Sequence, residues 1–143
     1  MKHDDDSVTA LRSVSLFAGL DDKALRRIAK QAKPYSFQPG TSVIDADSSG
    51  RFGRLYAVVS GSAEAQINGE PVATFGPGSY FGEMSVLDGR PRTATIIATS
   101  PLETYGLSTW NMRALLHEEP EIALHIIDTL TARLRDLNQK IAD

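Results

Sequence analysis

The residues best suited to chemistry lie in one short segment, FGEMSVLDGRPRTATI, which runs from Phe81 to Ile96. Glu83 offers a carboxylate that accepts hydrogen bonds from hydroxyl groups, and Arg92 offers a guanidinium that can bind a phosphate. A carboxylate so close to the arginine would repel a bare phosphate at short range. We therefore expect a ligand that carries hydroxyls beside its phosphate, as a ribose phosphate does.

The backbone of the same segment is also suited to an anion. Gly82 is predicted to cap a short helix that begins at Glu83 and closes at Asp88-Gly89. The amides of Glu83, Met84 and Ser85 would then lack partners within the helix, and together with the local dipole they favour an anion.

The arginine is expected to approach this turn from the next strand. Pro91 stiffens the connection, and Arg92 and Thr93 are predicted to occupy the first positions of a strand with the sequence RTATIIA. From there the guanidinium can turn back over the loop. Arg90 is expected to be a solvated turn residue, because Pro91 directs the two arginine side chains differently.

The glycines and turn signals indicate how the chain positions this segment. Ten of the eleven glycines lie between Gly40 and Gly106, and turn signals recur about every eight to twelve residues in that region. This spacing predicts a mainly β sandwich or barrel over residues 34–108. Helical periodicity predicts N-terminal helices over 8–33 and C-terminal helices over 109–142. One domain over residues 1–143 is expected.

Local signals predict individual elements within this layout. Asp21 is a predicted N-cap, and the helix after it has one apolar stripe that contains Leu25 and Ile28, followed by Ala29 and Ala32. In SAEAQI, apolar Ala63, Ala65 and Ile67 alternate with polar residues, which predicts a strand with one wet face. Asn68-Gly69 then predicts a hairpin.

The last part of the chain predicts a short helix from about Thr109 to Leu116 and a longer one from Pro120. Trp110 is expected to anchor the short helix to the β region. Apolar residues of the long helix follow the spacing of a coiled-coil seam: Ala123, Ile127, Leu130, Leu134, Leu137 and Ile141. Ile122 and Ile126 fall on a neighbouring face. One face is therefore expected to cover the β region while the other meets a second copy. The alternative is one broad core stripe in a monomer.

Composition argues against several other functions. The chain has no cysteine, which excludes disulfides, thiolate zinc sites and cysteine nucleophiles. Its net charge of -3 argues against a surface for duplex DNA. No long apolar stretch predicts a membrane span, and the start MKHDDDSVTA lacks the apolar core of a signal peptide, so we expect a cytoplasmic protein.

Metal and enzyme chemistry are not expected. His3, His117 and His125 lie in the tail and the helical segments, where each is expected to be solvated or partly packed, so no metal site or cofactor is predicted. A metal-dependent enzyme on a similar barrel would need histidines and a carboxylate converging inside it, and the predicted β region has no histidine. No catalytic residue is assigned.

The segment FGEMSVLDGRPRTATIIA resembles the phosphate-binding cassette of the cyclic-nucleotide-binding domain family. The resemblance covers nearly the whole chain. LFAGLDDKALRRIA resembles the entry helices of the family, FGRLYAVVSGSAEA its central strands, and LHEEPEIALHIIDTLTARLRDL the hinge and C-helix of its catabolite-activator branch. The resemblance implies a double-stranded β-helix, or jelly-roll barrel, with N-terminal helices, a hinge helix and a long C-helix. It also implies that residues 81–94 form the cassette of a regulatory sensor.

The same resemblance implies a role for each matching residue. Glu83 would bind the ribose 2′-hydroxyl, and Arg92 would bind the cyclic phosphate. The backbone from Gly82 to Ser85, with Thr93 and Ala94, would complete the phosphate cradle. The side chain of Ser85, where many members have alanine, adds a hydroxyl contact or nothing.

The resemblance says less about which base is bound and which residues contact it. Members that select cAMP often have alanine or serine at the position of Thr93, whereas threonine is common in members that bind cGMP and also occurs in bacterial-looking ones; cAMP is favoured. In the dimeric branch the C-helix covers the base, and Leu137 and Asn138 match the two positions that meet it there, one from each subunit. Asn138 is either a base contact or a solvated surface residue.

Two functions stay open from the sequence. The first is a sensor that binds a cyclic nucleotide as a regulatory ligand and signals through the cassette and the C-terminal helix, with a homodimer possible through that helix. The second is a ligand-free dimerisation or interaction module in which Glu83 and Arg92 pair with each other. In related transcription factors a helix-turn-helix follows the C-helix, whereas this sequence ends at Asp143, so direct DNA binding by this chain is not expected.

Overall fold

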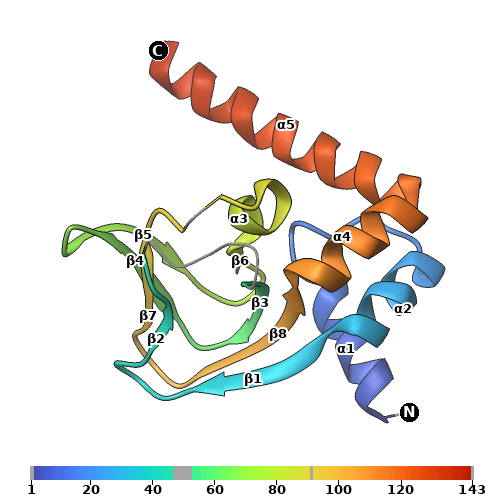
Figure 1. Ribbon diagram of the computed structural model, residues 1–143, viewed down its shortest axis with the longest axis horizontal. Coiled ribbons are helices and arrows are strands. Elements are labelled where there is room, and N and C mark those ends of the chain that lie inside the picture. Colours follow the sequence, from blue (N-terminus) through green and yellow to red (C-terminus); the bar gives the residue numbers. More distant parts are fainter. Residues whose placement is uncertain (1, 47–52, 91, 143) are drawn as a thin grey trace.

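The computed structural model describes residues 2–46, 53–90 and 92–142. These residues form two antiparallel sheets, with helices at both ends of the sequence (Figure 1). The predicted turn at 48–50 and Pro91 lie outside the described residues. In chain order the elements are α1 Lys2–Arg12, α2 Asp22–Gln31, β1 Lys33–Phe37, β2 Ser42–Ile44, β3 Arg54–Ser60, β4 Ala63–Ile67, β5 Glu70–Phe75, β6 Tyr80–Phe81, α3 Glu83–Asp88, β7 Thr95–Ala98, β8 Leu102–Ser108, α4 Thr109–Glu118 and α5 Pro120–Ala142.

The two sheets have the strand orders β1-β8-β3-β6 and β2-β7-β4-β5. This confirms the mainly β jelly roll with flanking helices. Within the described ranges the strands do not close into a barrel, because no ladder joins one sheet to the other. The chain crosses between the sheets through tight turns. At Gly61, between β3 and β4, φ is +87°, and a side chain would collide with the backbone carbonyl of Pro101.

Strand β3 lies between two hydrophobic cores. Leu55 and Ala57 face the core that the helices build, whereas Tyr56 and Val58 face the core between the sheets. Successive side chains of a strand point to opposite faces, so a strand that is covered on both sides is apolar at nearly every position. The sequence LYAVV in β3 is the result.

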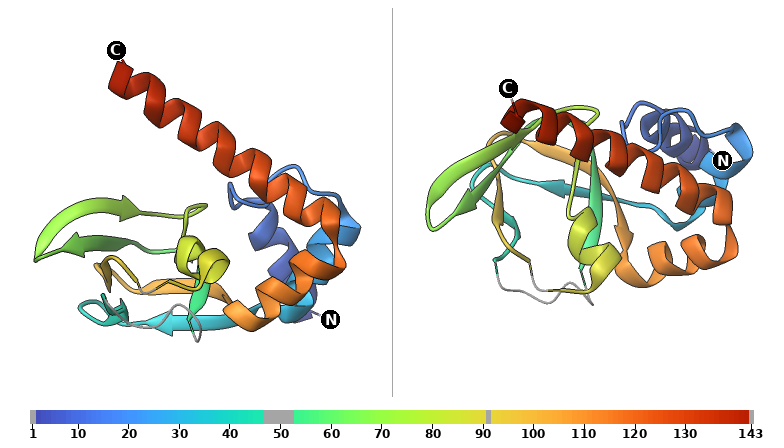
Figure 2. Two further views of the ribbon diagram at one scale, coloured as in Figure 1. Left: turned by 45° about the horizontal axis from the view of Figure 1, so that its top comes forward. Right: turned by 90° about the horizontal axis from the view of Figure 1, so that it is seen from above.

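The predicted hairpin after β4 is confirmed. Asn68 and Gly69 have φ values of 53° and 79°, the left-handed pair that a two-residue turn of this type needs. Ala63 and Ala65 are buried as expected, but Ile67 is 42% exposed although it was predicted on the same face. It lies near the tip of the hairpin, which projects beyond the rest of the sheets (Figure 2).

The N-terminal helices cover the outer face of the first sheet. Asp21 caps α2, since its Oδ1 accepts a hydrogen bond of 2.8 Å from the amide of Ala24. The predicted stripe is confirmed, because Leu25, Ile28, Ala29 and Ala32 are all buried. The helical region begins earlier than predicted, at Lys2 instead of residue 8.

The predicted short helix is α4, which Ser108 caps by accepting from the amide of Asn111. Met112 and Leu115 turn inward and are buried. The expectation that Trp110 anchors this helix is wrong, because its side chain is 83% exposed. Thr109, Met112 and Leu115 define the buried face of α4, and Trp110 falls outside that face.

The long helix α5 has a buried and an exposed apolar face, but Leu130 of the predicted seam packs against the helical core, and Leu124, outside the seam, is exposed. Ile122 and Ile126 are buried in the helical core. Ile127, Leu134, Leu137 and Ile141 are exposed, which is contrary to a single core stripe in a monomer. The helix runs above the rest of the molecule and projects away from the sheets (Figures 1 and 2).

Candidate functional site

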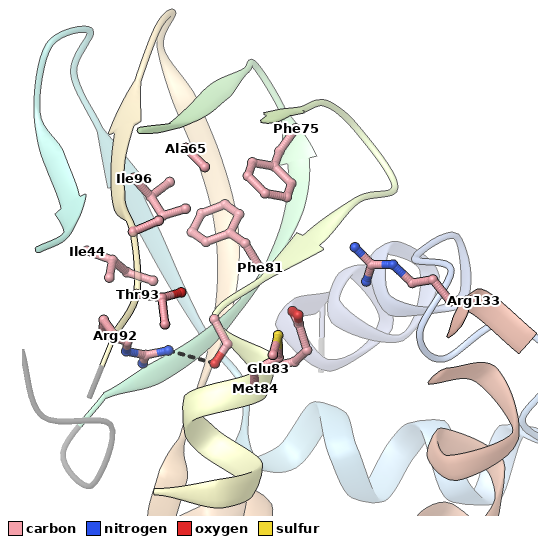
Figure 3. A pocket seen from close by; sticks show the side chains of 12 residues that line it. Ile44, Ala65, Phe75, Phe81, Glu83, Met84, Arg92, Thr93, Ile96 and Arg133 are labelled. Carbon is pink, nitrogen blue, oxygen red and sulfur yellow. Dashed lines mark hydrogen bonds between the residues drawn. The ribbon is translucent and has the colours of Figure 1, made fainter. Parts of the chain in front are cut away.

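A pocket opens between the second sheet, the cassette and α5 (Figure 3). Its walls come from strands β2, β4, β5, β6 and β7, from α3 and the loop before β7, and from one residue of α5. The lining residues are Ile44, Ala65, Phe75, Phe81, Gly82, Glu83, Met84, Arg92, Thr93, Ala94, Ile96 and Arg133.

Most of the predicted site residues meet in this pocket. Those that line it are Gly82, Glu83, Met84, Arg92, Thr93 and Ala94. Ser85 follows in α3. Asn138 does not line the pocket and is exposed on the projecting part of α5. The fold of one chain therefore brings the cassette residues together in the pocket, whereas Asn138 of the same chain lies outside this pocket.

Gly82 begins the cassette with a backbone that only glycine adopts easily. Its φ is +88°, and a Cβ at this position would lie 2.5 Å from the backbone carbonyl oxygen of Arg54. The carbonyl of Gly82 accepts from the amide of Val86 at 3.4 Å, as expected for a residue that caps α3. Glu83 is then the first residue of the helix, and its side chain is placed at the pocket.

Arg92 is buried, with 5% of its surface exposed, and is held by two backbone carbonyls. Its Nη1 donates to the oxygen of Gly82 at 2.6 Å, and its Nη2 donates to the oxygen of Arg54 at 2.9 Å. Burial lowers the pKa of the guanidinium, whereas Tyr56 and Glu83 act in the opposite direction. Arg92 was expected to begin a strand, but β7 begins at Thr95. The ladder to β4 starts only there, so the arginine lies in the preceding loop.

Glu83 carries a buried carboxylate that is not fully satisfied. Its Oε2 has no hydrogen-bond partner among the described residues. Burial raises the pKa of Glu83, and a hydrogen bond from its own backbone amide, together with the positive charges of Arg133 and Arg92, only partly opposes this effect. A buried acceptor without a donor is costly, and a ligand hydroxyl would remove that cost.

The pairing that the ligand-free alternative predicts is not found in the described part of the pocket. Arg92 donates to carbonyl oxygens, and Figure 3 draws its bond to Gly82 and none to Glu83. The Oε2 atom of Glu83 lacks a partner. The guanidinium of Arg92 and the carboxylate of Glu83 are thus held separately and do not neutralise each other by a direct hydrogen bond.

Arg133 is a pocket residue that sequence reasoning missed. It comes from α5, and its Nη1 donates to the hydroxyl of Tyr80 at 2.8 Å. Its guanidinium also lies 5.3 Å from the centroid of the Tyr80 ring. The only available signal was that Arg133 precedes Leu137 by one helical turn and so shares a face with it. Through this residue the long helix reaches the side of the pocket that Glu83 occupies (Figure 3).

The opposite side of the pocket is apolar. Phe75 and Phe81 lie with their ring centroids 5.1 Å apart, beside Ala65 and Ile96. Aromatic and aliphatic walls with a few placed polar groups are typical of small-molecule sites. The pocket therefore combines a charged region, at Glu83, Arg92 and Arg133, with an apolar region.

Two other kinds of site are not found in the described ranges. No group of three or more histidine, cysteine, aspartate or glutamate residues there could hold a metal ion. None of the helices in the described chain has the length and apolar character that a bilayer crossing demands.

Comparison with known proteins identifies the domain. A profile of the cyclic nucleotide-binding domain matches residues 34–119, which include both sheets and α4. The chain belongs to the cyclic-nucleotide-binding domain family. The matched region contains the whole cassette of this family, so the resemblance seen in the sequence is confirmed.

Relatives of this cyclic-nucleotide-binding domain are regulators. A CRP-like cAMP-activated global transcriptional regulator of Mycobacterium tuberculosis is 29% identical over 138 residues, covering 93% of this chain and 61% of the relative. A cAMP-dependent protein kinase regulatory subunit of Yarrowia lipolytica is 33% identical over 101 residues, covering 71% of this chain and 26% of the relative. The chain thus spans less than two thirds of the length of these curated relatives.

A solved structure shows the same fold. The N-terminal domain of a transcriptional regulator from Streptomyces coelicolor superposes with a TM-score of 0.77 at 27% identity, covering 91% of this chain and 95% of that one. The jelly roll with its flanking helices is therefore shared with that regulator domain.

Proposed function

We propose that this chain is a regulatory sensor domain that binds a cyclic nucleotide, preferring cAMP to cGMP, and signals through the cassette and α5. The observation that carries the proposal is the buried carboxylate of Glu83, with an unpartnered oxygen, in the same pocket as Arg92. Membership of the cyclic-nucleotide-binding family supports this interpretation of the pocket.

In the proposed complex each cassette group meets one part of the ligand. Glu83 accepts a hydrogen bond from the ribose 2′-hydroxyl, and Arg92 donates to the cyclic phosphate. The backbone from Gly82 to Ser85, with Thr93 and Ala94, completes the phosphate cradle. The nucleotide is a regulatory ligand in this proposal, and none of its bonds is broken.

No single contact suffices for useful affinity. A charge-assisted hydrogen bond from an arginine contributes about 1.5 to 3 kcal/mol, whereas micromolar binding requires about 8 kcal/mol. The 2′-hydroxyl contact, the backbone amides and burial of the base must supply the rest. The apolar wall at Phe75 and Phe81 offers surface for that burial.

The preference for cAMP rests on the relatives, whereas the threonine at position 93 is common in members of the family that bind cGMP. The two curated relatives are named as cAMP-activated and cAMP-dependent. Thr93 lines the pocket, and its hydroxyl is the group by which cGMP would be distinguished. The proposal therefore favours cAMP, and a titration with both nucleotides decides it.

We also propose that two chains associate through α5. Four of its exposed apolar residues follow the spacing of a coiled-coil seam, namely Ile127, Leu134, Leu137 and Ile141. In such a dimer Leu137 and Asn138 would cover the base, one from each subunit. This arrangement accounts for the position of Asn138 outside the pocket of its own chain.

Contact with DNA is not assigned to these residues. The mycobacterial relative is named a transcriptional regulator, but the match covers 61% of its length. The present chain has a net charge of -3, which disfavours a duplex-binding surface.

Calorimetric titration with cAMP and with cGMP tests the proposed function. We expect saturable binding to the wild-type chain, tighter for cAMP, and none to Arg92→Ala at the same concentrations. If neither nucleotide gives a heat of binding with a folded wild-type chain, the sensor function is overturned and the ligand-free interaction module is favoured. Equal binding by wild type and Arg92→Ala would overturn the site.

A further inference from the structure

Gly53, which directly precedes β3, lies against the guanidinium of Arg92. A Cβ built on Gly53 would lie 2.8 Å from Cζ of Arg92, 3.0 Å from its Nε and closer still to its Nη2. Non-bonded carbon atoms pack best at about 3.5 to 4.0 Å, so even a methyl group would have to displace the guanidinium. Gly53 does not have a left-handed φ. The requirement for glycine here is therefore one of space.

The guanidinium has little freedom to move aside. Its Nη1 and Nη2 are bonded to the carbonyls of Gly82 and Arg54, the second of which follows Gly53 in the chain. These two carbonyls and the bare Cα of Gly53 together form a seat for the arginine. The seat uses only some of the N–H donors of the guanidinium and leaves the others for a ligand.

The seat is fastened to the start of α4. The carbonyl oxygen of Gly53 accepts from the amide of Thr109 at 3.0 Å and from its Oγ1 at 3.2 Å. Thr109 is the first residue of α4 and is 5% exposed. The same helix also holds the cassette, because Nη1 of Arg113 donates to the carbonyl of Leu87 in α3 at 2.9 Å. One helix thus contacts both the seat of the arginine and the cassette.

We propose that Gly53 is a positioning residue for nucleotide binding. Because it has no side chain, the guanidinium of Arg92 can occupy its seat. The hydrogen bonds from Thr109 fix the position of that seat relative to α4. This inference rests on the proposed function, because it assigns Arg92 to the phosphate. Among the described residues, Gly53 does not itself line the pocket, so a side chain at position 53 is expected to disturb the ligand through Arg92.

Gly53→Ala tests the proposal, with Gly76→Ala as its matched control. A Cβ at Gly76 meets nothing within 4 Å, and its backbone is likewise not left-handed, so the two variants differ in the collision with Arg92. We expect titration to show cAMP affinity weakened about 10- to 100-fold in Gly53→Ala, the loss of one charge-assisted contact, and changed by less than about twofold in Gly76→Ala. Unchanged affinity in a folded Gly53→Ala would overturn the proposal.

A measurement without nucleotide separates this proposal from the proposed function. In wild type and Gly76→Ala, NMR of the Arg92 side chain should show slowed rotation and slowed hydrogen exchange of the Nη groups, because both are hydrogen-bonded; in Gly53→Ala this protection should be lost. Retained protection in Gly53→Ala would overturn the seat. Failure of the wild type to bind any cyclic nucleotide would overturn the proposed function and the phosphate role, and the NMR signal would still decide whether Gly53 seats Arg92.

Thr109 provides a second pair of variants in case Gly53→Ala does not fold. Thr109→Val removes the hydroxyl donor to Gly53, whereas Thr109→Ser keeps it. We expect cAMP affinity about two- to tenfold weaker in Thr109→Val than in Thr109→Ser. The same affinity in both variants would overturn the role of Thr109 in holding the seat.

Discussion

Glu83 and Arg92 show how a binding site can be prepared at the cost of stability. The oxygen Oε2 of Glu83 is buried without a donor, and burial raises the pKa of this carboxyl. Arg92 is also buried, but two carbonyls already satisfy part of its guanidinium. In the proposed function the carboxylate therefore receives its donor from the ligand, whereas the arginine is already held in place. Functional groups are commonly retained at such a cost.

Replacement of Glu83 by glutamine should raise stability and lower affinity. Because the pKa of Glu83 in the fold is above its ordinary value of 4.5, the stability it contributes is fully present below that value and is lost as the pH rises through the higher folded pKa. The stability gain of Glu83→Gln over wild type should therefore grow from acid toward neutral pH. Urea denaturation at a series of pH values measures it, with Glu70→Gln on exposed β5 as a control for charge. A gain that does not change with pH would contradict this prediction.

Replacement of Arg92 by lysine should be nearly as damaging as replacement by alanine. A lysine has no planar fork and cannot hold the carbonyls of Gly82 and Arg54 while it binds a phosphate. We expect a loss of about 1.5 to 3 kcal/mol in binding free energy, and about 1 to 3 kcal/mol in stability because buried carbonyls lose their donor. Titration and denaturation measure the two losses.

Arg90 supplies the control for this experiment. It is exposed, two residues before Arg92, and its amide donates to Asp88 at 2.8 Å. Arg90→Ala should leave both affinity and stability close to wild type. A loss as large as that of Arg92→Lys would show that general positive charge, and not the seated guanidinium, determines binding.

At the scale of elements, α5 joins the core, the pocket and the open surface. Ile122 and Ile126 fix its beginning in the helical core, and Arg133 ties its middle to Tyr80 beside the pocket. Beyond this point its described residues are exposed up to Ile141. The proposed signalling therefore requires that a change at the pocket alter the direction of a helix that is fixed at only one end.

An acidic residue in the exposed seam should prevent self-association. Leu134 is 58% exposed in the single chain, so Leu134→Glu should change the stability of the monomer by no more than about 0.5 kcal/mol. In a dimer, however, it would place two charges at a buried seam. Sedimentation velocity should show a dimer for wild type and for Gln139→Glu, an acidic change away from the seam, and a monomer for Leu134→Glu. A dimer in all three would exclude this face as the interface.

At the scale of the whole molecule, the ligand should tie together two cores that meet along β3. The helical core and the core between the sheets share this strand, and the pocket lies where the cassette and α5 approach the second sheet. Binding there would link elements of both. The stability of the entire fold should then report occupancy of the pocket.

Cyclic AMP at a hundredfold excess over its dissociation constant should add about 2.7 kcal/mol of stability. For a chain of this size the corresponding rise in Tm is about 5 to 10 °C. Differential scanning fluorimetry measures the shift, with Arg92→Ala and the acyclic nucleotide AMP as controls. A rise of the same size in Arg92→Ala would place the ligand elsewhere on the molecule.

The sequence by itself determined the features that depend on neighbouring residues. Three local features were predicted and found: the helix cap at Asp21, the turn at Asn68-Gly69 and the helix cap at Gly82. Each depends on the conformation or hydrogen bonding of a few consecutive residues, so the residue types specify it. The buried face of Ile122 and Ile126 follows from the periodicity of α5 in the same way, although Leu130 of the predicted seam packs against the same core. The cassette could be predicted because its main groups lie within one short segment.

Only the tertiary structure decided how distant segments meet. Arg92 takes its place from the carbonyl of Arg54 and from the space at Gly53, both far away in the sequence. Arg133 enters the pocket because α5 passes over it, and Trp110 stays exposed because other residues of α4 form its buried face. No local pattern records such contacts, since they arise only when sheets and helices pack. The chemistry of this site is therefore encoded locally, and its geometry depends on the packing of the whole domain.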